Sequence, residues 1–117
     1  YCDSGMIPWL LVAGLMSAKD STLAELVNER MQAFPASGEI NKTIAEPAAL
    51  IDSIQKRYQD KAVAIDHTDG LSMEFDSWRF NIRMSNTEPV VRLNVESRAN
   101  EALMKEKTKE LLVIIQD

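Results

Sequence analysis

The residues best suited to bind an anion gather in one short stretch, Arg83-Met84-Ser85-Asn86-Thr87-Glu88-Pro89. A guanidinium presents a planar fork of N–H donors, and hydroxyl and amide groups add donors compact enough to converge on phosphate oxygens. Pro89 fixes its own φ and favours an extended Glu88, so the loop is stiff and loses less entropy on binding a ligand. The stretch therefore predicts a phosphate-binding loop, although the same residue types also favour an ordinary turn.

Two runs of alternating apolar and polar residues flank this loop, Trp78 to Met84 and Val90 to Ser97. Alternation with a period of two is typical of strands with one buried face, so the loop is expected to join the strands of a β-hairpin. The apolar members are expected to face the core: Trp78, Phe80, Ile82, Met84, Val91, Leu93 and Val95. The polar members are expected to lie side by side on the opposite face: Arg79, Asn81, Arg83, Arg92, Asn94 and Glu96.

Patterns in the rest of the chain predict helices and further strands. Ser4 can cap a helix over residues 5–18, and Thr22 with Glu25 forms a capping box for a second helix that ends at Phe34-Pro35. Further helices are expected from Pro47 and over residues 100–116, and short strands within residues 36–44, 62–66 and 71–75. These elements predict an α+β fold: an antiparallel sheet of about four strands with helices packed on one face, preceded by a helical segment.

Length, charge and cysteine content exclude several classes of protein. The chain has 117 residues and a net charge of −5, which disfavours nucleic-acid binding because phosphate backbones are held by clustered Lys and Arg. Cys2 is the only cysteine, so a reducing cytoplasm fits, and no disulfide or cysteine-based metal site is expected. Residues 6–16 are apolar but too short for a membrane span of about 20 residues. Because the chain begins at Tyr1 with no leader, we expect it to be a piece of a longer protein.

The string Phe80-Asn81-Ile82-Arg83-Met84-Ser85-Asn86-Thr87-Glu88-Pro89-Val90-Val91-Arg92-Leu93-Asn94-Val95-Glu96 resembles the final-domain signature of the α-D-phosphohexomutases, which include phosphomannomutases and phosphoglucomutases. The resemblance covers essentially the whole chain and is closest to the bacterial phosphomannomutases. It continues through three weaker motifs: Tyr1-Cys2-Asp3-Ser4-Gly5-Met6, Phe34-Pro35-Ala36-Ser37-Gly38-Glu39-Ile40-Asn41 and Thr68-Asp69-Gly70-Leu71-Ser72-Met73. It implies that residues 1–34 are the helical tail of a third domain and residues 35–117 the fourth and last domain.

The resemblance also implies which residues bind the substrate. Four of them match the family's substrate-phosphate loop: Arg83, Ser85, Asn86 and Thr87. Many relatives have glycine where Asn86 stands, and asparagine is the next best residue for a positive φ. Arg92 recurs in the motif, but it is equally well explained as an exposed strand arginine paired with Glu96 or Glu88. Glu88 repels phosphate and is expected to orient Arg83 or Arg92 instead.

In this family a phosphoserine of the first domain donates its phosphoryl group to a hexose phosphate, through a bisphosphate intermediate. The resemblance thus implies a phosphomannomutase that interconverts mannose 6-phosphate and mannose 1-phosphate, with Mg²⁺ bound in the second domain, outside this chain. The expected partners are the hexose phosphate and the upstream domains. The chain alone is expected to be inactive, and no residue of it is expected to be catalytic or to bind a metal. Two alternatives stay open: a phosphoglucomutase or phosphoglucosamine mutase, and a non-enzymatic binding module.

Other residues with chemical potential have simpler explanations. His67 is the sole histidine, but beside a predicted turn it is expected to be a solvated surface residue. Trp78 and Phe80 are expected to belong to the core rather than to a platform for stacking bases. Three aspartates lack the dense spacing of a calcium loop and are expected to be turn residues: Asp66, Asp69 and Asp76.

Overall fold

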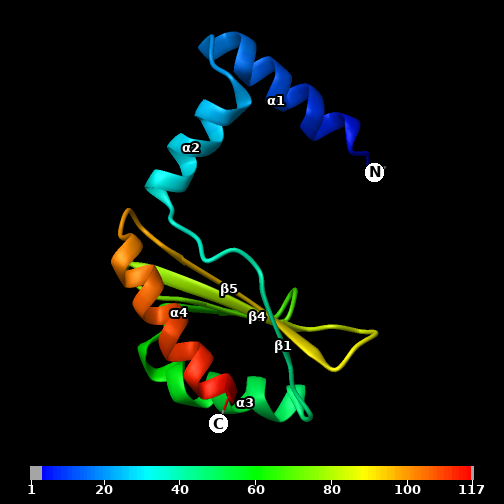
Figure 1. Ribbon diagram of the computed structural model, residues 1–117, viewed down its shortest axis with the longest axis vertical. Helices are drawn as coiled ribbons and strands as arrows, with labels where there is room; N and C mark the ends of the chain where they lie inside the picture. The colour runs from blue at the N-terminus through cyan, green and yellow to red at the C-terminus, as the bar shows by residue number, and fades with distance from the viewer. Residues whose placement is uncertain (1–3, 117) are drawn as a thin grey trace. The chain divides into compact units, whose positions relative to one another are not determined.

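A computed structural model describes residues 4–116 and divides into two compact units, Tyr1–Ala33 and Phe34–Asp117 (Figure 1). The motif residues Tyr1-Cys2-Asp3, with the lone cysteine, lie outside the described residues. The division falls beside Phe34-Pro35, where the chain changes from helical to mixed structure.

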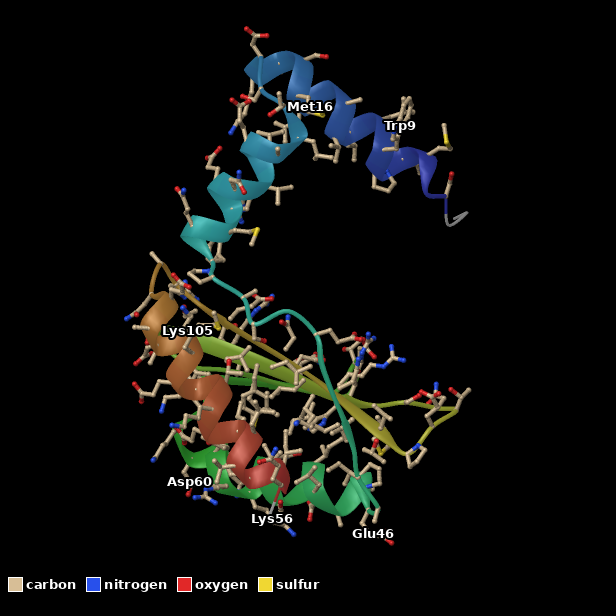
Figure 2. All side chains as sticks on the ribbon, in the orientation of Figure 1. Trp9, Met16, Glu46, Lys56, Asp60 and Lys105 are labelled. Atoms are coloured by element: carbon tan, nitrogen blue, oxygen red, sulfur yellow. The ribbon has the colours of Figure 1, made fainter. Side chains whose placement is uncertain are left out.

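The first unit consists of helices α1 (Met6–Lys19) and α2 (Leu23–Ala33). The predicted capping box starts α2: the Thr22 amide donates to the Glu25 carboxylate at 2.7 Å, and the Glu25 amide donates to the Thr22 hydroxyl at 3.2 Å. No residue of either helix is buried, and the side chain of Trp9 is 61% exposed (Figure 2). Among the described helices, none combines the length and the apolar character that crossing a bilayer requires.

The second unit is built on a five-stranded antiparallel sheet (Figure 1). Its strands are β1 (Ile40–Thr43), β2 (Ala64–Asp66), β3 (Leu71–Glu74), β4 (Trp78–Met84) and β5 (Val90–Ser97), in the spatial order β1-β5-β4-β3-β2. The predicted α+β class and antiparallel sheet are confirmed. The weakly alternating segment before residue 44 supplies β1, which pairs with β5 and makes the sheet five strands wide rather than about four.

Two helices, α3 (Pro47–Tyr58) and α4 (Glu101–Gln116), cover one face of this sheet; the short 3₁₀ helix η1 (Gln59–Lys61) extends α3. Tyr58 at the end of α3 makes edge-to-face contacts with three aromatic side chains: Phe75, just past β3, and Trp78 and Phe80 on β4. The remaining core side chains alternate along the strands or recur at helical spacing: Ile54, Leu71, Met73, Ile82, Val91, Leu93, Val95, Met104, Leu111 and Ile115. Helices therefore lie on one face only, and the other face carries the polar strand residues.

The predicted inner face of β4 is correct except at its last residue, since Met84 is 49% exposed. The pairing of β3 with β4 ends at Ile82, so Met84 has a strand neighbour only on its β5 side. The predicted polar rows do lie side by side, because β4 and β5 pair Arg79 with Glu96 and Arg83 with Arg92.

Candidate anion-binding site

The predicted phosphate-binding stretch, Arg83 to Pro89, begins at the end of β4, and its residues 85–89 form the loop that joins β4 to β5. The amide of Ser85 donates to the carbonyl of Val90 at 2.8 Å and closes the hairpin. The hydroxyls of Ser85 and Thr87 lie 3.4 Å apart, and the Thr87 amide lies 3.4 Å from the Ser85 hydroxyl. Asn86 is exposed at the tip. The loop thus gathers two hydroxyls on one side of a turn, next to the end of β4.

The rear of the loop is tied to the rest of the sheet. The carbonyl of Pro89 accepts a hydrogen bond of 2.9 Å from the amide of Ile44, just past β1, so the loop exit is anchored to the neighbouring strand. The predicted stiffness of this exit therefore has a second cause beside the proline ring.

Arg83, the last residue but one of β4, is held by two carboxylates from distant parts of the chain. Its Nη1 donates to Asp69 Oδ2 at 3.0 Å, and its Nη2 donates to Glu39 Oε2 at 3.2 Å. The hydrogen bond to Glu39 and the charge of Asp69 raise the pKa of the guanidinium above its ordinary value. The side chain remains 37% exposed, so the cation is fixed in position yet open to solvent.

Arg92 lies directly opposite Arg83 on β5. Its Nη1 is 3.9 Å from Glu39 Oε1, a long ion pair beyond hydrogen-bonding distance, and its Nε is buried without a partner among the described residues. Like charges directly opposite each other on neighbouring strands repel, so Glu39 offsets the repulsion between the two guanidinium groups. The structure therefore brings together two of the predicted site residues, Arg83 and Arg92, around a carboxylate.

That carboxylate corrects one prediction. Glu88 was expected to orient Arg83 or Arg92, yet within residues 4–116 both arginines are contacted by Glu39, and Arg83 also by Asp69. The alternative partner of Arg92, Glu96, instead accepts from Arg79 Nε at 2.9 Å. Glu39 lies 44 residues before Arg83 in the chain, a distance at which no local spacing rule links two side chains.

The β2–β3 turn positions Asp69 through Gly70. Gly70 has a φ of +76°, and a Cβ there would lie 2.6 Å from both the Ile82 carbonyl oxygen and Arg83 Cβ. Only glycine allows the turn to approach β4 so closely, which places the Asp69 carboxylate within reach of Arg83. The predicted Asp69-Gly70 turn is thus part of the site.

The other residues of chemical interest in the sequence lie away from this cluster. His67 is exposed, and Asp66 accepts hydrogen bonds from the amide and hydroxyl of Thr68, at 2.8 and 3.1 Å, which lower its pKa as in an ordinary turn. Trp78 and Phe80 are 8% and 2% exposed, so both belong to the core as predicted.

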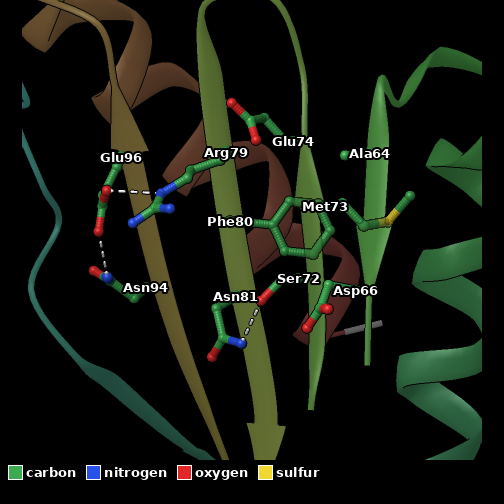
Figure 3. A pocket seen from close by; sticks show the side chains of 10 residues that line it. All are labelled: Ala64, Asp66, Ser72, Met73, Glu74, Arg79, Phe80, Asn81, Asn94 and Glu96. Carbon is green, nitrogen blue, oxygen red and sulfur yellow. Dashed lines mark hydrogen bonds and ion pairs between the residues drawn. The ribbon is translucent and has the colours of Figure 1, made fainter. Parts of the chain in front are cut away.

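The polar face of the sheet also carries a groove of about 320 Å³, which no pattern in the sequence predicts (Figure 3). Its polar side chains bond to one another: Arg79 and Asn94 both donate to the carboxylate of Glu96, and Asn81 donates to the Ser72 hydroxyl at 2.9 Å. The groove is lined by three carboxylates and one arginine, whereas at the hairpin end two arginines face two carboxylates, so the groove suits an anion less well.

Comparison with known proteins identifies the family. A family model described as "Phosphoglucomutase/phosphomannomutase, C-terminal domain" matches residues 39–112. The chain is 62% identical to a phosphomannomutase of Salmonella montevideo over 98% of its length, and 58% identical to one of Escherichia coli K12 over 100%. It is 50% identical to a protein named phosphohexose mutases from Xanthomonas campestris pv. campestris, over 95% of the chain.

The chain spans only about a quarter of these relatives, 25%, 26% and 25% of their respective lengths. Among solved structures, a phosphoglucomutase/phosphomannomutase family protein of Burkholderia thailandensis matches 69% of the chain with 18% of its own, at a TM-score of 0.50 and 25% identity. The chain therefore belongs to the phosphoglucomutase/phosphomannomutase family and contains its C-terminal domain.

Proposed function

We propose that this chain holds the substrate's phosphate group in a phosphomannomutase, an enzyme that interconverts mannose 6-phosphate and mannose 1-phosphate. The observation that carries the proposal is the 62% identity to a protein named phosphomannomutase, along 98% of the chain. The paired arginines beside a loop of hydroxyl and amide donors support it, since they suit a doubly charged phosphate.

In this proposal the chain binds the phosphate that is not being transferred. Arg83 supplies a fork of charged donors, Arg92 adds a second cation, and the loop residues Ser85, Asn86 and Thr87 supply hydroxyls and an amide. Binding a remote phosphate positions the reacting end of the sugar and helps to exclude water, which would otherwise hydrolyse a phosphoenzyme. The chain thus contributes orientation rather than bond making.

The groups that transfer the phosphoryl group, a phosphoserine and Mg²⁺, belong to upstream domains in this proposal. Within residues 4–116, no cluster of three His, Cys, Asp or Glu side chains could hold a metal ion. Residues 1–34 would then be the tail of the third domain and residues 35–117 the fourth domain of a cytoplasmic enzyme.

The role of Arg83 can be tested in the full-length enzyme that carries this chain. Arg83→Ala removes charged hydrogen bonds to a remote phosphate, so we expect KM for mannose 1-phosphate to rise roughly tenfold to a hundredfold. Arg79→Ala is the matched control, because Arg79 lies on the same strand and face but pairs with Glu96. If both variants have the same KM and kcat as the wild type, Arg83 and its loop do not bind the substrate.

A substrate panel separates the related activities. The matching family description names phosphoglucomutase beside phosphomannomutase, so glucose 1-phosphate is the first competitor to test, followed by glucosamine phosphate. We expect the highest kcat/KM for mannose phosphate in the full-length enzyme and no turnover by residues 1–117 alone. Turnover by the isolated chain would contradict the proposed division of labour.

A non-enzymatic binding module would behave differently in a titration of the isolated chain. Mannose 1-phosphate is expected to shift the amide NMR signals of Ser85 and Thr87, and a short oligonucleotide is not, because the net charge of −5 repels it. The opposite pattern would favour a binding module.

A further inference from the structure

The phosphate site, as proposed above, is already occupied by a side chain of the protein itself. Glu39 places one carboxylate oxygen 3.2 Å from Arg83 Nη2 and the other 3.9 Å from Arg92 Nη1. A carboxylate that bridges two guanidinium groups takes the position in which two arginines would bind a phosphate. With Asp69, the cluster has two positive and two negative groups and a formal charge of zero, so a dianion meets no net attraction there.

We propose that Glu39 is an internal competitor: its carboxylate bridges Arg83 and Arg92 in the empty site, and the phosphate group of the substrate displaces it. The inference rests on the proposed function and adds to it a residue that sets the affinity for the phosphate group. It also gives a role to the motif Phe34 to Asn41, which the proposed function leaves without one.

The contacts of Glu39 allow its side chain to leave without moving the backbone. Glu39 is 45% exposed, and its contact with Arg92 is too long for a hydrogen bond. Its backbone, in contrast, lies between two fixed points. On one side, Ser37 donates its amide to Val95 O at 2.8 Å and accepts the Val95 amide on its hydroxyl at 3.0 Å; on the other, Ile40 pairs with Leu93. A change of the Glu39 rotamer is enough to free Nη2 of Arg83 and Nη1 of Arg92, while Asp69 keeps its contact with Nη1 of Arg83.

The phosphate can take over the role that the Glu39 carboxylate has in the empty site. In the empty site Glu39 offsets the repulsion between two arginines that face each other across β4 and β5. A phosphate dianion bound between them does the same with twice the charge and more acceptor oxygens. The exchange keeps the arginines ordered in both states, so the site need not be rebuilt when the substrate arrives.

The experiment compares dissociation constants for mannose 1-phosphate among variants of the chain, from the amide shifts of the loop. Glu39→Gln removes the competing charge and keeps the size of the side chain, so we expect the Kd to fall about twofold to fivefold, as suits a solvent-exposed ion pair. Glu88→Gln is the control: it removes one charge from the loop itself, at a residue with no ion pair among those described. It measures the general effect of charge, which must be smaller than the effect of Glu39→Gln.

The outcomes separate this inference from the proposed function. If Glu39→Gln weakens binding, Glu39 positions the arginines rather than competing with the ligand, and the inference is wrong. The inference is also wrong if Glu39→Gln and Glu88→Gln change the Kd by the same factor. In that case the proposed function still holds if the wild type binds the ester and Arg83→Ala abolishes the binding. If neither the wild type nor Glu39→Gln binds the ester, the phosphate site itself is wrong, and the inference is overturned with it.

Discussion

At the scale of single residues, the site depends on one backbone conformation that only glycine adopts easily. Gly70 combines a φ of +76° with contacts that leave no space for a Cβ against β4. Arg83 donates a hydrogen bond to the carboxylate of Asp69, which lies in this turn. A substitution at Gly70 is therefore expected to alter both the stability of the fold and the contacts of Arg83. The phosphate site and the packing of the β2–β3 turn are therefore coupled through a position that carries no side chain.

Gly70→Ala is expected to lower the free energy of unfolding by about 2–5 kcal/mol, from the strained φ together with the clash. Gly38→Ala is the control, because Gly38 has a φ of +71° but open space around it, and should cost only about 1 kcal/mol. Urea denaturation of the two variants measures the difference. Equal losses of unfolding free energy in the two variants would show that β4 accommodates the added Cβ without an energetic cost.

At the scale of elements, α3 and α4 are joined by a hydrogen bond at the edge of the core. The hydroxyl of Tyr58 donates to Glu110 Oε1 at 2.6 Å, and Lys107 contacts the other oxygen at 2.7 Å. The bonds from Lys107 and then Tyr58 lower the pKa of Glu110, while burial and the nearby carboxylate raise the pKa of Tyr58. A partly exposed carboxylate thus links the end of α3 to the middle of α4.

This link predicts a specific acid sensitivity. Because folding lowers the pKa of Glu110, its stabilisation is complete above the ordinary value of 4.5 and is lost as the pH falls through the lowered value. We expect Glu110→Gln to be about 0.5–1 kcal/mol less stable than the wild type at pH 7, and we expect this gap to narrow as the pH falls below 4.5, by urea denaturation. Tyr58→Phe should show a smaller pH dependence than the wild type. A constant gap between wild type and Glu110→Gln would contradict this assignment.

The elements were predictable from the sequence because their signals are local. Alternation defined β4 and β5, and the capping box defined the start of α2, each within a few residues. The alternation wrongly predicted that Met84 is buried, because its burial depends on where the neighbouring strand β3 ends. The loop residues were likewise visible as a string, whereas the carboxylate of Glu39 reaches Arg83 only through the pairing of β1 with β5. No local sequence pattern predicts that pairing.

At the scale of the whole molecule, the two units differ in how they are stabilised. Every residue of the buried core belongs to the unit Phe34–Asp117, whereas the described helices of the first unit bury none. Large apolar side chains of α1 are exposed instead, Trp9 and Leu11 among them. The stability of the second unit should therefore not depend on the first.

A chain that starts at Phe34 is expected to keep the amide NMR spectrum of the sheet and its helices, and to unfold in urea with the free energy that the same residues show in the full chain. It should also be more soluble, because the exposed apolar helix is gone. Collapse of signal dispersion in the shortened chain would show that the helical unit supports the sheet, and would count against the domain boundary proposed at residues 34 and 35.

The pairing of β1 with β5 has a further consequence for biosynthesis. The strand β1 leaves the ribosome before the other four strands, and it cannot pair until β5, its only neighbour among the described strands, has been synthesised. We expect the β4–β5 hairpin, whose strands are adjacent in sequence, to close before β1 docks, because a longer stretch of chain separates β1 from β5. Since Glu39 directly precedes β1, we expect Arg83 and Arg92 of a nascent chain to be open to cellular anions until β1 docks and brings Glu39 beside them.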